Sequence, residues 1–155
     1  MASQLRVDKI VPVDGAPTGG GGGIIQVVQT VKQDQFTTSS TSFVDVTGFS
    51  ATITPKFNTS KILVMVMTTL QQTGTRTRVD IHNSTSGGVI SGSSNGMQAA
   101  EGTSVNIPCH LSFLHSPATT SATTYKLQVM NTGGNTSYVN ASVHTGTMTL
   151  MEVSA

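Results

Sequence analysis

The sequence contains little charge, one cysteine and few aromatic residues. Asp, Glu, Lys and Arg make up 10% of its 155 residues, and the formal net charge is +1. A chain so close to neutral has no electrostatic attraction for nucleic acid or for an anionic membrane surface, so we expect neither as a partner. One cysteine cannot close an internal disulfide, and a chain of this length can bury a core without one. These absences predict a single domain held together by apolar packing.

Long hydrophobic runs are also missing. The longest apolar run, residues 62–67, is far shorter than the roughly 20 residues that a helix needs to cross a bilayer. Arg6, Asp8 and Lys9 interrupt the N-terminal region, where a signal peptide would be continuously apolar. The sequence therefore predicts a protein that is made in a cytoplasm and does not insert into a membrane.

Five consecutive glycines, residues 19–23, divide the chain into an arm and a head. Polyglycine has no preferred conformation and predicts a flexible hinge. Residues 1–18 form the arm, in which Pro12 and Pro17 disfavour a helix and favour an extended chain. We expect the arm to dock onto a neighbouring protein, although it could also be the first strand of the head. Its candidate anchoring residues are Leu5, Val7, Ile10, Val11 and Val13.

Residues 24–155, the predicted head, alternate between short strand patterns and turn signals. Strands are expected at 24–32, 42–47, 50–54, 61–70, 77–82, 105–113, 123–130, 137–143 and 147–153, with a surface loop at 92–102. Pro108 cannot donate a hydrogen bond to a neighbouring strand, so its strand should lie at an edge or carry a bulge. This pattern predicts an all-β fold, an antiparallel β-sandwich of the jelly-roll kind.

The segment 61–70 is apolar on both faces over its first half. Such a strand is either central and covered on both sides or in contact with another subunit. Methionine side chains, which adapt to irregular surfaces, occur here and in the last strand. The candidate subunit-interface residues are Ile62, Val64, Met65, Val66, Met67, Met148 and Met151.

Residues that could carry chemistry are few and scattered. Cys109 falls on the apolar face of its strand, which indicates a buried structural thiol and not a nucleophile. The four histidines lack the close spacing of metal ligands within one chain, although a symmetric assembly could gather His110 or His144 from several copies. Arg76 and Arg78 could bind an anion or pair with Asp80 or Asp45, but solvated side chains are the favoured interpretation. We expect no catalytic residue, no metal and no cofactor; a carbohydrate-processing enzyme is the minor alternative.

Polar loops between strands are the expected recognition surface, because loops carry most binding residues on a rigid sandwich. The candidates are Gln72, Thr73, Ser84, Thr85, Ser94, Asn95, Gln98 and Asn135.

Four segments resemble small virion proteins of tailed bacteriophages, particularly those of cyanobacteria. They are the arm LRVDKIVPVDGAP followed by glycines, residues 60–64 (SKILV), residues 116–126 (SPATTSATTYK) and the ending MTLMEV at 148–153. The resemblance implies a jelly-roll head similar to tumour necrosis factor and C1q, assembled as a homotrimer. It also implies a virion location, with the arm fastened to a tail, fibre or capsid protein. The expected role is a tail-fibre or fibre-tip protein whose head contacts the host surface, with a surface glycan as one candidate receptor. The alternative is a capsid decoration protein that stabilises the shell.

Overall fold

The computed structural model describes residues 23–101 and 104–154. The predicted arm and most of the predicted hinge lie outside these residues, and so do the five candidate anchoring residues. Gly23, the first described residue, is paired with Ser154 near the other end of the chain. Its backbone N–H donates to Ser154 Oγ (3.1 Å), and its carbonyl accepts from the Ser154 N–H (2.9 Å).

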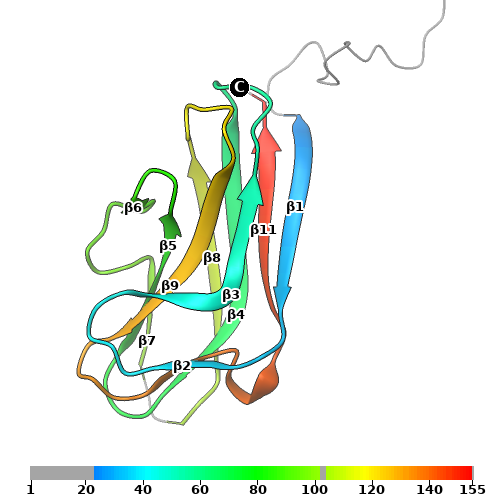
Figure 1. Ribbon diagram of the computed structural model, residues 1–155. Helices are drawn as coiled ribbons and strands as arrows, with labels where there is room; N and C mark the ends of the chain where they lie inside the picture. The colour runs from blue at the N-terminus through cyan, green and yellow to red at the C-terminus, as the bar shows by residue number, and fades with distance from the viewer. Residues whose placement is uncertain (1–22, 102–103, 155) are drawn as a thin grey trace, which may run out of the picture.

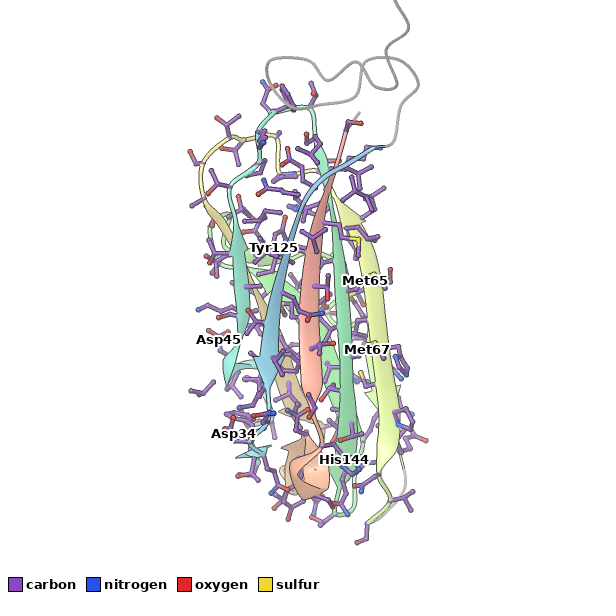
Figure 2. The ribbon with its side chains drawn as sticks, turned by 90° about the vertical axis from the view of Figure 1, so that its right-hand side faces the viewer. Asp34, Asp45, Met65, Met67, Tyr125 and His144 are labelled. Carbon is purple, nitrogen blue, oxygen red and sulfur yellow. The ribbon has the colours of Figure 1, made fainter. Side chains whose placement is uncertain are left out.

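Sheet A contains six strands, and every pair in it is antiparallel. Its hydrogen-bonded order is β1 (Ile24–Lys32), β11 (Gly146–Val153), β4 (Lys61–Gln72), β10 (Ser137–Val139) and β2 (Phe36–Thr38). On its other side β4 pairs with β8 (Ile107–His115). Figure 2 shows β1, β11, β4 and β8 side by side, viewed onto this sheet.

Sheet B contains five antiparallel strands and packs against sheet A (Figure 1). Its order is β3 (Val44–Ile53), β9 (Thr123–Asn131), β5 (Thr77–Asn83) and β6 (Gly88–Val89), with β7 (Gln98–Ala100) also paired to β5. A single 3-10 turn, η1 (Ala141–Val143), is the only helical element in the ranges 23–101 and 104–154. The all-β antiparallel sandwich predicted from sequence is confirmed, with a jelly-roll-like arrangement of two sheets.

Alternating side chains from the two sheets fill the space between them, as expected for strands with a two-residue period. The residues at the centre of this core are fully buried; the largest are Tyr125, Phe49, Ile53, Ile62, Leu70, Ile81, Leu127, Met148 and Leu150. No helix in the described part of the chain is long and apolar enough to cross a membrane.

Several strands differ from the sequence-based expectation: β8 is Ile107–His115 and not 105–113, β2 is not among the expected strands, and two further differences have a clear cause in the backbone. The expected strands 42–47 and 50–54 are one strand, β3, whose register with β9 shifts between Asp45 and Ser50. Gly48 lies inside this shift with φ +75, a conformation that glycine adopts without strain. The expected strand 137–143 ends at Val139, because Asn140 has φ 55 and turns the chain into η1.

The loop expected at 92–102 contains a short strand, β7, which adds to the edge of β5. The position of Pro108 agrees with the prediction, because β8 pairs only with β4 among the described strands and so forms an edge of sheet A. At an edge, the missing N–H of proline can face solvent, so no neighbouring strand loses a hydrogen bond.

Candidate functional site

The outward side chains of sheet A form a surface that carries almost no charge. One row of directly opposed residues crosses its four long strands and is entirely apolar: Val27 of β1, Met151 of β11, Leu63 of β4 and Leu114 of β8. Val27 is 54% exposed and Leu114 is 49% exposed, while Leu63 and Met151 are half-buried. A continuous apolar belt therefore spans the width of the sheet on its solvent side.

Two further rows follow the apolar belt along the strands. The three rows together define the outer face of sheet A: Val27, Met151, Leu63 and Leu114; Gln29, Thr149, Met65 and Ser112; Val31, Thr147, Met67 and His110. None of these residues is Asp, Glu, Lys or Arg. Figure 2 shows Met65 and Met67 along β4 on this side of the molecule, and Met67 is 50% exposed. Contiguous exposed apolar surface of this kind is characteristic of interaction sites.

The structure corrects part of the predicted subunit interface. Ile62, Val64, Val66 and Met148 are fully buried between the two sheets and cannot contact another subunit. Successive residues of a strand point to opposite faces, so these four belong to the core and their neighbours belong to the surface. Met65, Met67 and Met151 lie on the outer face of sheet A, and their role in a subunit interface stays a prediction.

Two of the predicted recognition residues do not lie in loops. Gln72 is the last residue of β4 and is fully buried, and neither of its side-chain amide atoms has a hydrogen-bond partner. Gln98 lies in β7, where its Oε1 accepts a hydrogen bond from Cys109 Sγ (3.1 Å). Both glutamines are therefore unavailable as loop recognition residues.

The other recognition candidates occupy loops that do not form one surface. Thr73 and Asn135 lie in neighbouring loops, because the Thr73 N–H donates to the Thr136 carbonyl (3.0 Å). Ser84 and Thr85 follow the opposite end of β5. Ser94 and Asn95 lie in the segment that connects β6 with β7, where Asn95 Oδ1 accepts from Arg78 Nη1 (2.8 Å). A single contact with a partner could thus include only part of this set.

The one thiol of the chain is unreactive because it is buried. Cys109 is fully buried, and this burial raises the pKa of its thiol to about 12. A cysteine nucleophile needs an accessible thiolate near neutral pH. The expectation of a buried structural cysteine is confirmed.

The carboxylates are engaged separately by different parts of the fold. Asp45 accepts hydrogen bonds from Lys126 Nζ (2.8 Å) and Gln128 Nε2 (2.8 Å), which lower its pKa. Glu152 is fully buried. Burial alone would raise its pKa, but hydrogen bonds from Gln26 Nε2 (2.6 Å) and the Lys56 N–H (2.8 Å) lower it overall. Within residues 23–101 and 104–154, no group of three or more His, Cys, Asp or Glu residues could hold a metal ion.

Asp80 is a fully buried carboxylate of sheet B. It accepts hydrogen bonds from Ser91 Oγ (2.6 Å) and the Ile81 N–H (2.7 Å), yet desolvation raises its pKa. Neither Arg76 nor Arg78 pairs with it: Arg76 forms an ion pair with Glu101 at the rim of a shallow pocket of about 490 Å³, and Arg78 bonds Asn95. Neither arginine pairs with Asp80 or Asp45, so this alternative to solvated side chains is not found.

We expect Asp80→Asn to leave the stability at pH 7 unchanged or higher. A raised pKa means that the folded state disfavours the ionised carboxylate, so the wild type should gain stability as pH falls through the folded pKa towards the unfolded one. Asparagine can accept from Ile81 and donate to Ser91 without the charge. Urea unfolding of both proteins from pH 7 to pH 4 should show the variant's advantage shrinking on acidification, and a growing advantage would contradict this reading.

The structure brings together two histidines that are 34 positions apart in the sequence. His110 of β8 and His144, which follows η1, line one pocket of about 230 Å³ at the end of the outer face of sheet A, together with Met67, Thr69 and Pro108. His115 lies elsewhere and contacts Tyr125, with 2.8 Å between His115 Nδ1 and the Tyr125 hydroxyl. The spacing of His110 and His144 in the sequence gives no signal that they line the same pocket, because this depends on how β4, β8 and the segment after η1 are arranged.

Comparisons with known proteins show the fold. No protein-family model and no curated protein match the sequence. A structure of T=1 particles derived from infectious bursal virus has a TM-score of 0.50 and 14% identity, covering 97% of this chain and 41% of that chain. Structures of infectious bursal disease virus are also similar: the Gt strain gives a TM-score of 0.47 and 15% identity over 97% of this chain and 43% of that chain.

The VP2 subviral particle of infectious bursal disease virus gives a TM-score of 0.46 and 14% identity, covering 97% of this chain and 42% of that chain. This chain spans about two fifths of the length of those proteins. The resemblance to phage virion proteins and to tumour necrosis factor and C1q stays a prediction. The head shares a β-sandwich fold with a protein found in virus-derived particles.

Proposed function

We propose that this chain is a non-enzymatic structural protein of a virus particle. Its head associates with copies of itself, as a homotrimer, through the outer face of sheet A. The N-terminal arm, residues 1–18, fastens the assembly to another virion protein. The observation that carries the proposal is the apolar row Val27, Met151, Leu63 and Leu114, which crosses four strands on the solvent side of the sheet.

The chemistry of this face suits self-association. Its three rows lack charged side chains, so a partner copy could cover it without removing ions from water, which is the main cost of burying a charged surface. The exposed thioethers of Met65 and Met67 can adapt to a facing surface. The fold supports the same role, because a β-sandwich similar to this one is built into particles derived from infectious bursal virus.

The position of the assembly on the virion is the finer part of the proposal. A tail-fibre or fibre-tip protein would bind a tail or fibre component through the arm, and exposed loop residues at one end of the head, such as Thr73 and Asn135, would face the host. A decoration protein would bind assembled capsids. Pull-down with the full chain against isolated tail components and against assembled capsids distinguishes the two roles, because only one of these partners should retain it.

Introducing charge on the outer face of sheet A should disrupt association. In the double variant Met65→Lys/Met67→Lys, each copy would bring two ammonium groups into the interface, where like charges repel and lose water. We expect the dissociation constant measured by sedimentation velocity to rise by at least about tenfold. Thr52→Lys is the control, because it places one such ammonium group on an exposed position of β3 in sheet B, away from the outer face of sheet A. Equal association of all three proteins would refute this interface.

A further inference from the structure

The pocket that His110 and His144 share has the composition of a transition-metal site. It is an open pocket of about 230 Å³ between β4, β8 and the segment after η1, and its lining contains two imidazoles and a thioether but no carboxylate, lysine or arginine. Neutral imidazole is a preferred ligand of Zn²⁺, Cu²⁺ and Ni²⁺, whereas Mg²⁺ and Ca²⁺ prefer oxygen ligands. The pocket therefore favours late transition metals over hard cations.

The orientation of His144 provides a second, independent observation. Its Nδ1 contacts the backbone carbonyl oxygen of Ala141, three residues earlier in the chain. A carbonyl oxygen can only accept, so Nδ1 carries the proton and the lone pair of the neutral ring is on Nε2. Metal-binding histidines are commonly fixed in this way, with the second ring nitrogen donating to a backbone carbonyl. The turn at η1 thus prepares Nε2 of His144 as a ligand.

The sheet register positions the second imidazole. His110 lies directly opposite Met67 in the β4–β8 pair, and Pro108 lies opposite Thr69. Met67 and Thr69 of β4 also line the pocket. His144 reaches it from the other side of β4, where the η1 segment joins β10 to β11. His110 is exposed, so its ring is accessible to an ion from solvent.

We propose that this pocket binds one late first-row transition-metal dication through Nε2 of His144 and a ring nitrogen of His110. The remaining coordination positions are left to water or to the Met67 thioether. The site uses residues of one chain, but His110 and Met67 also belong to the outer face of sheet A, so metal binding and the proposed assembly would compete for this end of the face. The site differs from the sequence-based expectation that a single chain has no metal site.

Isothermal titration calorimetry of the full chain with Zn²⁺ tests the proposal. We expect one ion per chain, with His110→Gln and His144→Gln each weakening binding by at least about tenfold. His82→Gln is the matched control, because His82 lies in β5 of sheet B, and its binding should equal the wild type. Cu²⁺ should bind more tightly than Zn²⁺, and Mn²⁺ more weakly.

Three results would overturn the site: no Zn²⁺ binding, binding that neither variant weakens, or equal binding of Mg²⁺. Circular dichroism of each variant verifies that its fold is intact, and NMR of the imidazole resonances identifies the ligands directly: only those of His110 and His144 should shift with Zn²⁺. Light scattering on the same samples measures association separately. A chain that is monomeric before Zn²⁺ is added and then binds the ion would retain the site and refute the assembly.

Discussion

Replacing Asn140 with alanine should lower the free energy of unfolding by about 3 kcal/mol. Asn140 is fully buried where β10 ends; its Oδ1 accepts from Thr68 Oγ1 (2.6 Å) and its Nδ2 donates to the Lys32 carbonyl (2.9 Å). The substitution leaves both partners without these bonds, and an unsatisfied buried polar group costs about 1–3 kcal/mol. Residue 140 has φ 55, and alanine is less stable than asparagine in this left-handed conformation, which adds roughly 1 kcal/mol to the loss.

Urea unfolding followed by circular dichroism measures this loss. Asn58→Ala is the matched control, because Asn58 is exposed and should change stability by no more than about 0.5 kcal/mol. The neighbouring Gly146 gives an independent check on the same junction: a Cβ there would approach Asn140 Oδ1 at 2.5 Å and Phe49 Cζ at 2.9 Å, so Gly146→Ala should also destabilise. An unchanged midpoint for Asn140→Ala would show that this buried junction does not stabilise the head.

Alanine substitutions of two methionines on opposite faces of sheet A should have different effects: one should weaken the core and the other should weaken association. Met148 is fully buried in the core, and Met148→Ala should lower the free energy of unfolding by about 3 kcal/mol because it leaves a cavity. Met67 is half exposed on the outer face, so Met67→Ala should lower the free energy of unfolding of an isolated chain by no more than about 1 kcal/mol. Its substitution should instead weaken association.

Protein concentration separates these two effects, because association stabilises the folded state by mass action. Thermal unfolding over a hundredfold dilution series should give a loss for Met148→Ala that is the same at every concentration. The loss for Met67→Ala should decrease on dilution to the small value of the isolated chain, as the wild type dissociates. If the two variants behaved alike, the assignment of inner and outer faces in sheet A would be wrong.

Much of the fold could be predicted from alternation and turn residues. The boundaries of β1 agree with the expected strand at 24–32, and the edge position of β8 follows from Pro108. The alternation of apolar and polar residues does not predict the strand boundaries where the backbone departs from regular strand geometry. The register shift at Gly48 separates two half-patterns of one strand, and the positive φ of Asn140 ends β10 within the expected strand 137–143. Neither deviation changes the residue pattern enough to be recognised in advance.

The candidate site was predictable only in part. Alternation separates Ile62 and Val64 from Met65, but which set faces inward depends on where sheet B lies, and the sequence does not contain that position. Buried Glu152 could have been recognised, because it continues the inward series of Met148 and Leu150 along β11. The pairing of His110 with His144 needed the three-dimensional arrangement of β8, β4 and η1.

The mass of the purified full-length chain in solution tests the central claim most directly. Multi-angle light scattering after gel filtration should give three times the chain mass of 16.1 kDa, and a single-chain mass for Met65→Lys/Met67→Lys. A wild-type chain that stays monomeric at every concentration tested would contradict self-association through the outer face of sheet A, and with it the proposed role of the head in a virion assembly.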